Sequence, residues 1–261
     1  DAPSDANRQT AWSLFANSDE VDISLAITGS ASIAVQQYVI DNIATVRKDC
    51  IAFLSPPSAN VVNQGGSEST NITNWLSSLS RSSSYVVADS GWKYQLDKYN
   101  NVYRWMPLNA DIAGLCVNTD TVRDPWFSPA GLNRGGITQA VQTLDRLTHS
   151  ERDTLYEGRV NPIAAFPGQG ICVWGQKTLQ VESSALDRIN VRRLLINLKK
   201  YIASTSKYLV FEQNVAATRN RFLSIVNPYL ENVQQRSGLY AFQVKMDDTN
   251  NTPDIVDRNI L

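Results

Sequence analysis

Residues 22–54 read DISLAITGSASIAVQQYVIDNIATVRKDCIAFL, and this stretch decides the fold. Residues 22–28 alternate polar and apolar side chains, which is typical of a strand. Residues 33–47 then place apolar side chains at helical spacing, namely Val35, Val39, Ile43 and Val46. Residues 50–54 form a short apolar run before two prolines, as a buried strand does. This order predicts a β-α-β unit with parallel strands and a right-handed crossover.

The chain that follows continues the alternation of helix and strand patterns. Residues 70–79 favour a helix capped by Asn71 or Thr70, and residues 85–88 favour a strand. Residues 138–147 repeat apolar side chains at helical spacing and predict a further helix.

Residues 89–104 (DSGWKYQLDKYNNVYR) predict a β-hairpin that turns at Asn100 and Asn101. Aromatic residues occur on both arms: Trp92, Tyr94, Tyr99, Tyr103 and Trp105. Such residues could stack on a carbohydrate, but aromatic pairs across the two strands are the simpler interpretation.

The last third of the chain predicts three strands and two helices in alternation. A strand ends near Gly175, and a basic amphipathic helix follows from residue 187. The segments YLVFEQN (208–214) and FQVKM (242–246) predict two more strands. Pro228 should kink or interrupt the helix between them.

These patterns predict an α/β fold with a mixed, largely parallel sheet, flanked by helices and carrying a β-hairpin insertion. We expect two regions, residues 1–159 and residues 160–261. The 261 residues carry 24 Lys and Arg against 25 Asp and Glu, a net charge of −1. This balance gives no electrostatic drive toward nucleic acid or an anionic membrane. No apolar run approaches the length of a membrane helix, so we expect no membrane insertion.

The sequence offers few metal ligands. Cys50, Cys116 and Cys172 lie in apolar runs that predict buried thiols, and His149 is the single histidine. The acidic segment at residues 247–250 could attract calcium, but its spacing does not match an EF-hand and favours a turn. We therefore expect no metal and no cofactor.

A serine hydrolase would need His149 as its base. Thr148, His149 and Ser150 instead resemble the start of a helix, with Thr148 or Ser150 as the cap. The sequence has no GxSxG motif, and Gly29 alone does not make a nucleotide-binding loop. We expect no enzyme and no catalytic residues, with a serine hydrolase as the remote alternative.

Three arginines, Arg188, Arg192 and Arg193, gather at the start of the basic helix. They could form a patch for nucleic acid. The neutral charge of the chain instead favours pairing with carboxylates on a neighbouring subunit or domain.

The last third also resembles the tail sheath proteins of contractile-tailed, T4-like bacteriophages. The matching segments are 172–175 (CVWG), 190–194 (NVRRL), 211–212 (FE), 250–253 (NNTP) and 257–259 (DRN). Weaker matches lie in residues 111–136. The resemblance implies a structural subunit that forms six-fold rings around a tail tube, receives a signal from a baseplate and contracts to deliver the genome. It also implies a place in the virion tail, after assembly in the host cytoplasm. The sheath of a contractile bacteriocin or of a type VI-like secretion machine is the alternative.

In this family, terminal arms add strands to the sheets of neighbouring subunits. We expect the chain to be a fragment without both arms and to be monomeric. The apolar side chains Ile255, Val256, Ile260 and Leu261 are the candidate subunit interface, because they lie in a predicted strand or strand exit that would lead into an arm.

Overall fold

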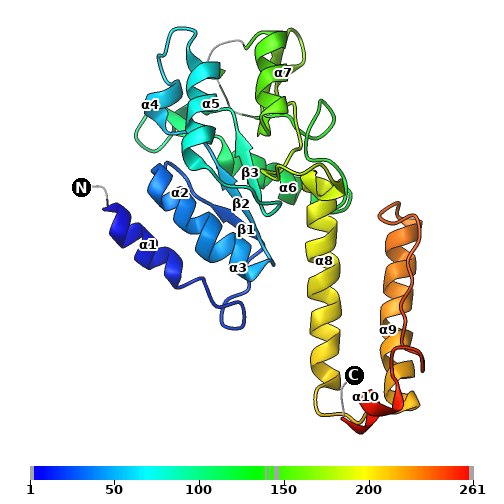
Figure 1. The fold of residues 1–261 in the computed structure, drawn as a ribbon. Helices are drawn as coiled ribbons and strands as arrows, with labels where there is room; N and C mark the ends of the chain where they lie inside the picture. Colours follow the sequence, from blue (N-terminus) through cyan, green and yellow to red (C-terminus); the bar gives the residue numbers. More distant parts are fainter. Residues whose placement is uncertain (1–2, 139, 141, 144–146, 259–261) are drawn as a thin grey trace. The chain divides into compact units, whose positions relative to one another are not determined.

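The computed structural model describes residues 3–138, 140, 142–143 and 147–258 (Figure 1). The chain divides into two compact units, Asp1–Ile196 and Asn197–Leu261. The division expected at residue 159 stays a prediction.

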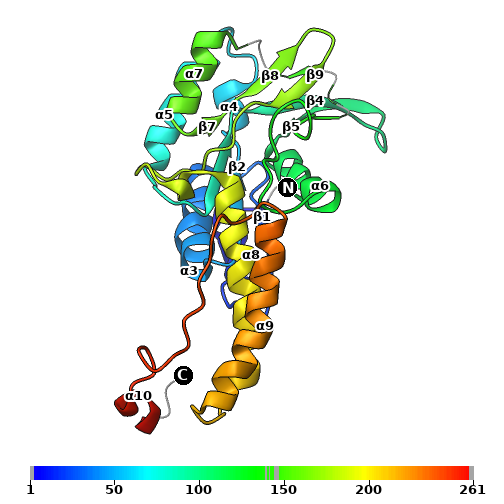
Figure 2. The same cartoon turned by 90° about the vertical axis from the view of Figure 1, so that its right-hand side faces the viewer.

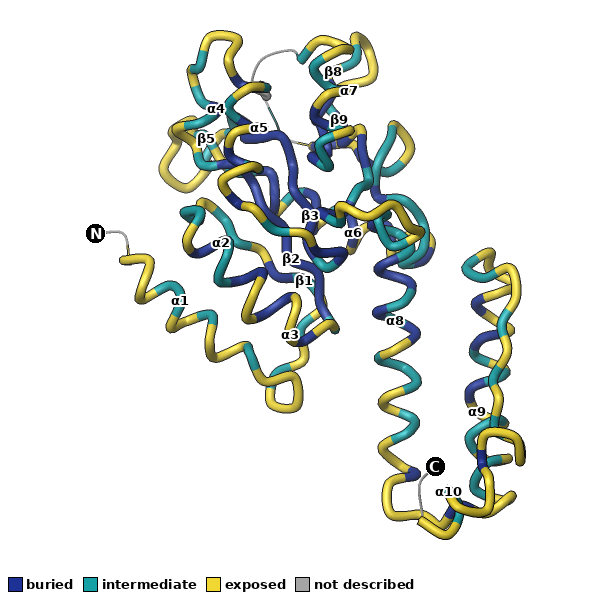
Figure 3. Tube along the Cα trace, in the orientation of Figure 1, coloured by how far each residue is buried: buried dark blue, intermediate teal, exposed yellow. Residues whose placement is uncertain are grey.

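The first unit is built on a four-stranded parallel sheet, as the sequence predicts. Its strands are β1 (Leu25–Ile27), β2 (Ile51–Leu54), β3 (Val86–Asp89) and β7 (Val160–Asn161), in the order β1-β2-β3-β7. The two central strands, β2 and β3, are buried along their whole length (Figure 3).

Helices cover both faces of this sheet (Figures 1 and 2). The connection from β1 to β2 is helical throughout and consists of α2 (Ile33–Val39), a π-helical turn (Ile40–Ala44) and α3 (Thr45–Arg47). Two helices, α4 (Ser58–Val61) and α5 (Glu68–Leu79), connect β2 to β3. An N-terminal helix, α1 (Asp5–Ser13), contacts α2.

Alternate side chains of the central strands belong to two different cores. Ala52, Leu54, Val86 and Ala88 pack with α2, α5 and the helix α7 (His149–Glu157). Ile51, Phe53 and Val87 pack with α6 (Asn109–Val122) and the start of α8 (Ile189–Ser206). This alternation places one layer of helices on each face of the sheet.

The predicted hairpin is present as β4 (Trp92–Asp97) and β5 (Val102–Pro107). Tyr94 lies opposite Trp105, and their ring centroids are 5.2 Å apart, so the cross-strand aromatic pair is confirmed. The indole Nε1 of Trp92 donates to the carbonyl oxygen of Pro56 at 2.7 Å, which ties the base of the hairpin to the end of β2.

The helix predicted at residues 138–147 is wrong where the structure describes it. Gln142 and Thr143 form β6, which pairs with β4 and completes a three-stranded sheet. Val141 and Leu144 lie outside the described residues. A separate two-stranded sheet, β8 (Ile163–Phe166) and β9 (Gly170–Val173), contains the strand predicted before Gly175.

Two predicted helix caps have different outcomes. Thr148, one of the two residues expected to cap this helix, caps α7 through a capping box with Glu151. The cap position of α5 is Ser67 rather than Asn71 or Thr70, because the helix begins one turn earlier with Glu68.

The second unit contains the continuation of α8, a 3-10 turn (Lys207–Leu209), α9 (Ala216–Gln235) and α10 (Pro253–Asp257). The rings of Tyr201 and Tyr229 stack with centroids 3.6 Å apart, and the Tyr229 hydroxyl donates to Asn197 at 2.8 Å. Pro228 lies inside α9, which continues on both sides of it.

The strands predicted in the second unit are wrong. Residues 208–214 form the 3-10 turn and an irregular segment, and residues 242–246 belong to no ladder. The region expected to be strand around Ile255 and Val256 is the short helix α10. No helix among the described residues of either unit has the length and apolar character to cross a membrane.

A buried amide joins α2, α5 and the end of β2. The Nε2 of Gln36 donates to the carbonyl oxygens of Ala31 and Ser55, at 3.2 and 2.8 Å. Its Oε1 accepts the indole Nε1 of Trp75 at 2.9 Å. All polar atoms of this buried side chain are therefore satisfied.

Replacement of Trp75 by Phe should destabilise the chain by about 2–4 kcal/mol, because it removes the donor to Gln36 and leaves a cavity. Urea unfolding monitored by circular dichroism measures this loss. Trp174→Phe is the control, since Trp174 is 45% exposed and should lose less than about 1 kcal/mol. Equal losses in the two variants would contradict the role of the buried amide.

Candidate functional site

The carboxyl edge of the parallel sheet is the first place to look for a site, because open α/β sheets bind ligands there. Ser55 follows β2, Asp89 ends β3 and Asn109 begins α6. The Ser55 hydroxyl lies 2.7 Å from Oδ2 of Asp89 and accepts the backbone N–H of Asn109 at 3.0 Å. The Nδ2 of Asn109 donates to the carbonyl oxygen of Gly29, at the end of β1, at 2.8 Å.

Burial raises the pKa of Asp89 to about 8, although the hydrogen bonds from Ser55 and the Gly91 N–H oppose this shift and the charge of Asp111 adds to it. Ser55, Asp89 and Asn109 are all buried. The cluster is therefore a closed polar junction and offers no access to a substrate.

The candidates for catalysis are not brought together. His149 is 83% exposed on the first turn of α7 and pairs with Asp153. The buried Ser55 has Asp89 and Asn109 as its side-chain and backbone partners, and no imidazole. The serine-hydrolase alternative thus has no nucleophile and base in contact among the described residues.

An open cavity of about 530 Å³ lies between α6 and the hairpin. Its polar lining includes Lys93 and Asp111, whose Nζ and Oδ1 are 2.6 Å apart. These two charges neutralise each other, so the cavity presents no unpaired charge from this pair.

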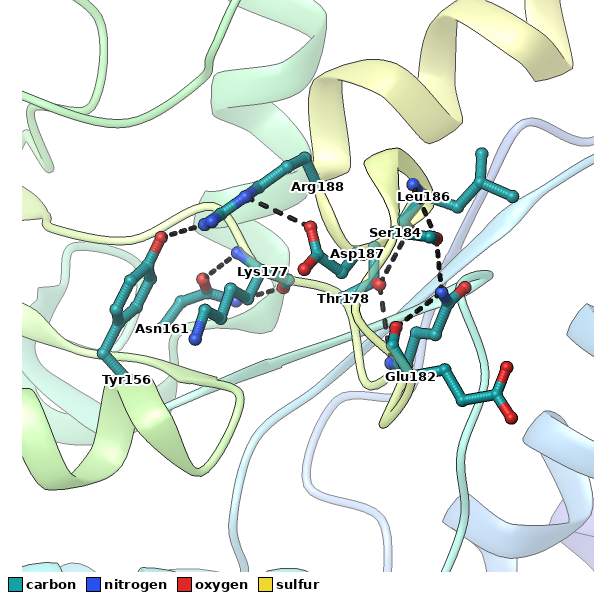
Figure 4. A network of polar contacts seen from close by, with 10 residues as sticks. Tyr156, Asn161, Lys177, Thr178, Glu182, Ser184, Leu186, Asp187 and Arg188 are labelled. Atoms are coloured by element: carbon teal, nitrogen blue, oxygen red, sulfur yellow. Dashed lines mark hydrogen bonds and ion pairs between the residues drawn. The ribbon is translucent and has the colours of Figure 1, made fainter.

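A second polar cluster surrounds Asn161, at the end of β7 (Figure 4). The Nδ2 of Asn161 donates to the carbonyl oxygens of Ala88 at 2.9 Å and Lys177 at 2.8 Å. Its Oδ1 accepts the backbone N–H of Lys177 at 2.6 Å. One buried amide therefore ties β3, β7 and the segment after β9 together.

The segment from Lys177 to Arg188 is closed by its own hydrogen bonds (Figure 4). Thr178 donates its hydroxyl to the carbonyl oxygen of Leu186, and Gln180 donates its amide to Glu182 and Ser184. The Arg188 guanidinium donates to the Tyr156 hydroxyl and pairs with Asp187 at 3.1 Å. This segment leads directly into α8.

Gly175 allows the close packing of this cluster. A Cβ atom at Gly175 would lie 2.9 Å from Oδ1 of Asn161 and 3.0 Å from the Tyr156 ring. The first distance is shorter than contacts of real Cβ atoms and the second is tighter than most of them, so a side chain here would force Asn161 or Tyr156 to shift.

The three arginines of the basic helix are bound within the chain. Arg193 pairs with Asp120 of α6, and Arg192 donates to the hydroxyls of Tyr85 and Ser84. The Arg192 guanidinium also lies 4.1 Å from the Tyr85 ring centroid. Arg192 and Arg193 are buried, which argues against a nucleic-acid patch. The carboxylate partner of Arg193 was expected on a neighbouring subunit or domain, and this expectation is wrong, because Asp120 lies on α6 of the same unit.

Three expectations for metals and thiols can be compared with the described residues. Cys50, Cys116 and Cys172 are buried free thiols, as predicted. Asp247 forms a turn in which Oδ1 accepts the N–H of Thr249 at 2.8 Å. In the part of the chain that the structure describes, no three His, Cys, Asp or Glu side chains gather as metal ligands.

Sequence reasoning missed Ser55, Asp89 and Asn161 as junction residues. A usable signal was present, because each polar residue directly follows or ends a buried strand. Carboxyl ends of parallel strands lie at one edge, so such residues meet.

The candidate interface residues have different outcomes. Ile255 and Val256 lie half-buried in α10 of the second unit, while Ile260 and Leu261 lie outside the described residues. Their role in an interface stays a prediction.

An extended segment precedes α10. In residues 241–246 the side chains of Phe242, Val244 and Met246 are half-buried, and those of Ala241, Gln243 and Lys245 are exposed. No hydrogen bond engages the backbone groups of residues 241–244 in the described structure. The segment has the alternation of a strand without a strand partner.

The described residues form an α/β fold with closed polar junctions, and no nucleophile and base are in contact among them. A family model for the phage tail sheath protein central domain matches residues 22–179, and one for the phage tail sheath C-terminal domain matches residues 181–260. The chain belongs to the phage tail sheath family, whose members are structural proteins rather than enzymes.

Curated relatives support this assignment. The tail sheath protein of Vibrio phage KVP40 is 45% identical over 255 residues, covering 90% of this chain and 38% of the relative. That of Enterobacteria phage T4 is 40% identical, covering 95% of this chain and 40% of the relative. The chain thus spans about two fifths of the length of these relatives.

Solved structures share the fold. The helical sheath of the anti-feeding prophage in its contracted state has a TM-score of 0.69 and 22% identity, covering 94% of this chain and 63% of that one. The PVC sheath complex of an extracellular contractile injection system, in its contracted state, has a TM-score of 0.70 and 19% identity, covering 87% of this chain and 59% of that one.

Gly175→Ala should destabilise the chain by about 1–3 kcal/mol, because the new methyl group would overlap Asn161 and Tyr156. Gly114→Ala is the matched control. Gly114 lies inside α6, and a Cβ atom there would meet no heavy atom within 4 Å beyond its own helix, so alanine should stabilise the helix by about 0.5–1 kcal/mol. Thermal and urea unfolding measure both changes, and a neutral Gly175→Ala would contradict the packing.

Proposed function

We propose that this chain is the central and C-terminal part of a contractile tail sheath subunit. Such a subunit polymerises around a tail tube and contracts to drive the tube through the host envelope, which delivers the phage genome. The observation that carries the proposal is the match of both sheath domains along residues 22–179 and 181–260.

The first unit suits a mechanical role. Its sheet is packed on both faces, and three buried polar side chains join its elements: Gln36, Asp89 and Asn161. A close-packed interior resists deformation, as a subunit that moves as a rigid body requires. The paired or buried arginines support protein partners rather than nucleic acid.

The segment 241–246 supports a strand joint between subunits. The backbone groups of residues 241–244 could pair with a strand from a neighbouring subunit, and backbone hydrogen bonds give such a joint its strength. Ile255 and Val256 follow on α10 and are proposed to flank this joint, together with Ile260 and Leu261 beyond the described residues. We infer that residues 1–159 carry the N-terminal part of the α/β region and residues 160–261 its C-terminal part.

The proposed partners are other sheath subunits, the tail tube and the baseplate, without nucleic acid or membrane insertion. The proposed location is the virion tail, after assembly in the host cytoplasm. The chain by itself is expected to be monomeric. A contractile injection system is the second candidate, because solved sheaths of such systems share the fold. Identities of 40 and 45% to phage sheaths favour the phage.

The test places this chain in the tail sheath protein of Enterobacteria phage T4, in exchange for the matched residues. Negative-stain electron microscopy should show hollow tubes of regular diameter, while residues 1–261 alone should sediment as a monomer. Folded but monodisperse particles under all salt conditions would contradict the proposed sheath function.

Two variants of the same chimera test the proposed strand joint at residues 241–246. The double change Gln243→Pro and Val244→Pro removes two consecutive backbone N–H groups, which point to opposite edges of a strand, and should abolish tubes. The control, Gln243→Thr with Val244→Thr, retains both groups and should form tubes. Tubes from the proline variant would exclude pairing through this segment.

A further inference from the structure

The carboxyl group of Asp89 holds both ends of the β4–β5 hairpin. Its Oδ1 accepts the N–H of Gly91, one residue before β4, at 2.8 Å. Its Oδ2 lies 2.7 Å from the Ser55 hydroxyl, which in turn accepts the N–H of Asn109, two residues after β5. The N–H of Leu108 donates to the carbonyl oxygen of Gly91 at 3.1 Å and closes the loop.

This carboxyl group is buried without a cation. Asp89 is 1% exposed, and its hydrogen-bond partners in the described structure are the neutral Ser55 and Gly91. An ionised carboxylate in such a place lacks both water and a counter-ion, so its neutral form is favoured.

The neighbouring elements do not supply the missing charge. The charged group that acts on Asp89 is Asp111 from α6, which disfavours a second negative charge and is itself paired with Lys93 of β4. The end of β2 and the paired strand β7 contribute Ser55 and Asn161, which do not titrate in this range.

A protonated Asp89 also fits the hydrogen bonds. The acid proton would be donated to the Ser55 oxygen, which releases the hydroxyl hydrogen of Ser55. The Ser55 oxygen would then accept both this proton and the Asn109 N–H, as its two lone pairs allow.

We propose that Asp89 is a proton-dependent latch: its neutral form fastens the hairpin and α6 to the sheet, and its ionisation at alkaline pH loosens them. Between the ordinary pKa of an aspartate and the folded pKa of about 8, Asp89 is neutral in the closed junction and ionised in an open, hydrated junction. In this range the closed junction therefore binds one proton more than the open junction. Closure is therefore strongest below the ordinary pKa of an aspartate and weakens as the pH rises through the folded pKa of about 8.

The test measures hydrogen exchange of the backbone amides of Gly91 and Asn109 by NMR in residues 1–261, from pH 5 to pH 9. Protection factors, which remove the intrinsic pH dependence of exchange, should fall by at least about tenfold between pH 6 and pH 8. Amides inside α5, such as those of Ile72 and Leu76, should keep constant protection factors over this pH range when α5 unfolds locally without the junction.

Asp89→Asn should abolish this pH dependence, because an amide can accept from Gly91 and donate to Ser55 without titrating. Asp19→Asn is the control, since it removes the same charge from an exposed loop and should leave the fall in place. Protection factors at Gly91 and Asn109 that stay flat from pH 5 to pH 9 would overturn the latch.

A second measurement keeps the proposal falsifiable if Asp89→Asn does not fold. The carbon chemical shift of the Asp89 carboxyl group in the unmodified chain reports its titration directly. We expect a midpoint near pH 8, well above the ordinary range of an aspartate carboxyl group. A midpoint below pH 5 would show that the group is ionised when buried, and the latch would be excluded.

Discussion

The hydrogen bonds of Asn161 are the constraint on which much of the first unit depends. A parallel sheet leaves unpaired backbone groups where its strands end, and a buried group of this kind costs about 1–3 kcal/mol. Asn161 supplies two donors and one acceptor at such a place, which join the end of β3 to the segment at Lys177. That segment leads into α8, so one amide side chain connects the sheet to the helix that begins the second matched domain.

At each end of the strand β3 lies a buried ionisable side chain that has no ion-pair partner in the described structure: Arg192 of α8 at the start and Asp89 at the end. At its start, the Arg192 guanidinium lies on the Tyr85 ring and donates to neutral hydroxyls, and burial lowers the pKa of Arg192. At its end, Asp89 is bound to Ser55 and Gly91. The two groups differ in outcome, because an arginine remains charged at any ordinary pH, whereas a carboxyl group can become neutral. Only the carboxyl end can respond to pH.

Local sequence patterns predicted the elements whose causes are local. A few neighbouring residues are enough to predict each of these elements: the strand at residues 50–54, the turn at Asn100 and Asn101, and the helix cap at Thr148. The junctions at Asp89 and Asn161 could not be predicted in this way, because each has a partner that is distant along the chain: Ser55 lies 34 residues from Asp89, and Ala88 lies 73 residues from Asn161. Ladder pairing also decides Gln142 and Thr143, which form a strand because β4 is beside them.

The strand pattern of residues 241–246 was wrong as a prediction of this fold, yet the pattern itself is real in the structure, since the side chains alternate between half-buried and exposed. A strand is defined by its partner as much as by its sequence, and here the described chain provides none. The sequence therefore specifies a strand-like segment, and the backbone groups of residues 241–244 have no hydrogen-bond partner in the described structure. Under the proposed function, a close-packed core and an unpaired strand-like segment are the two features that a polymerising structural subunit requires.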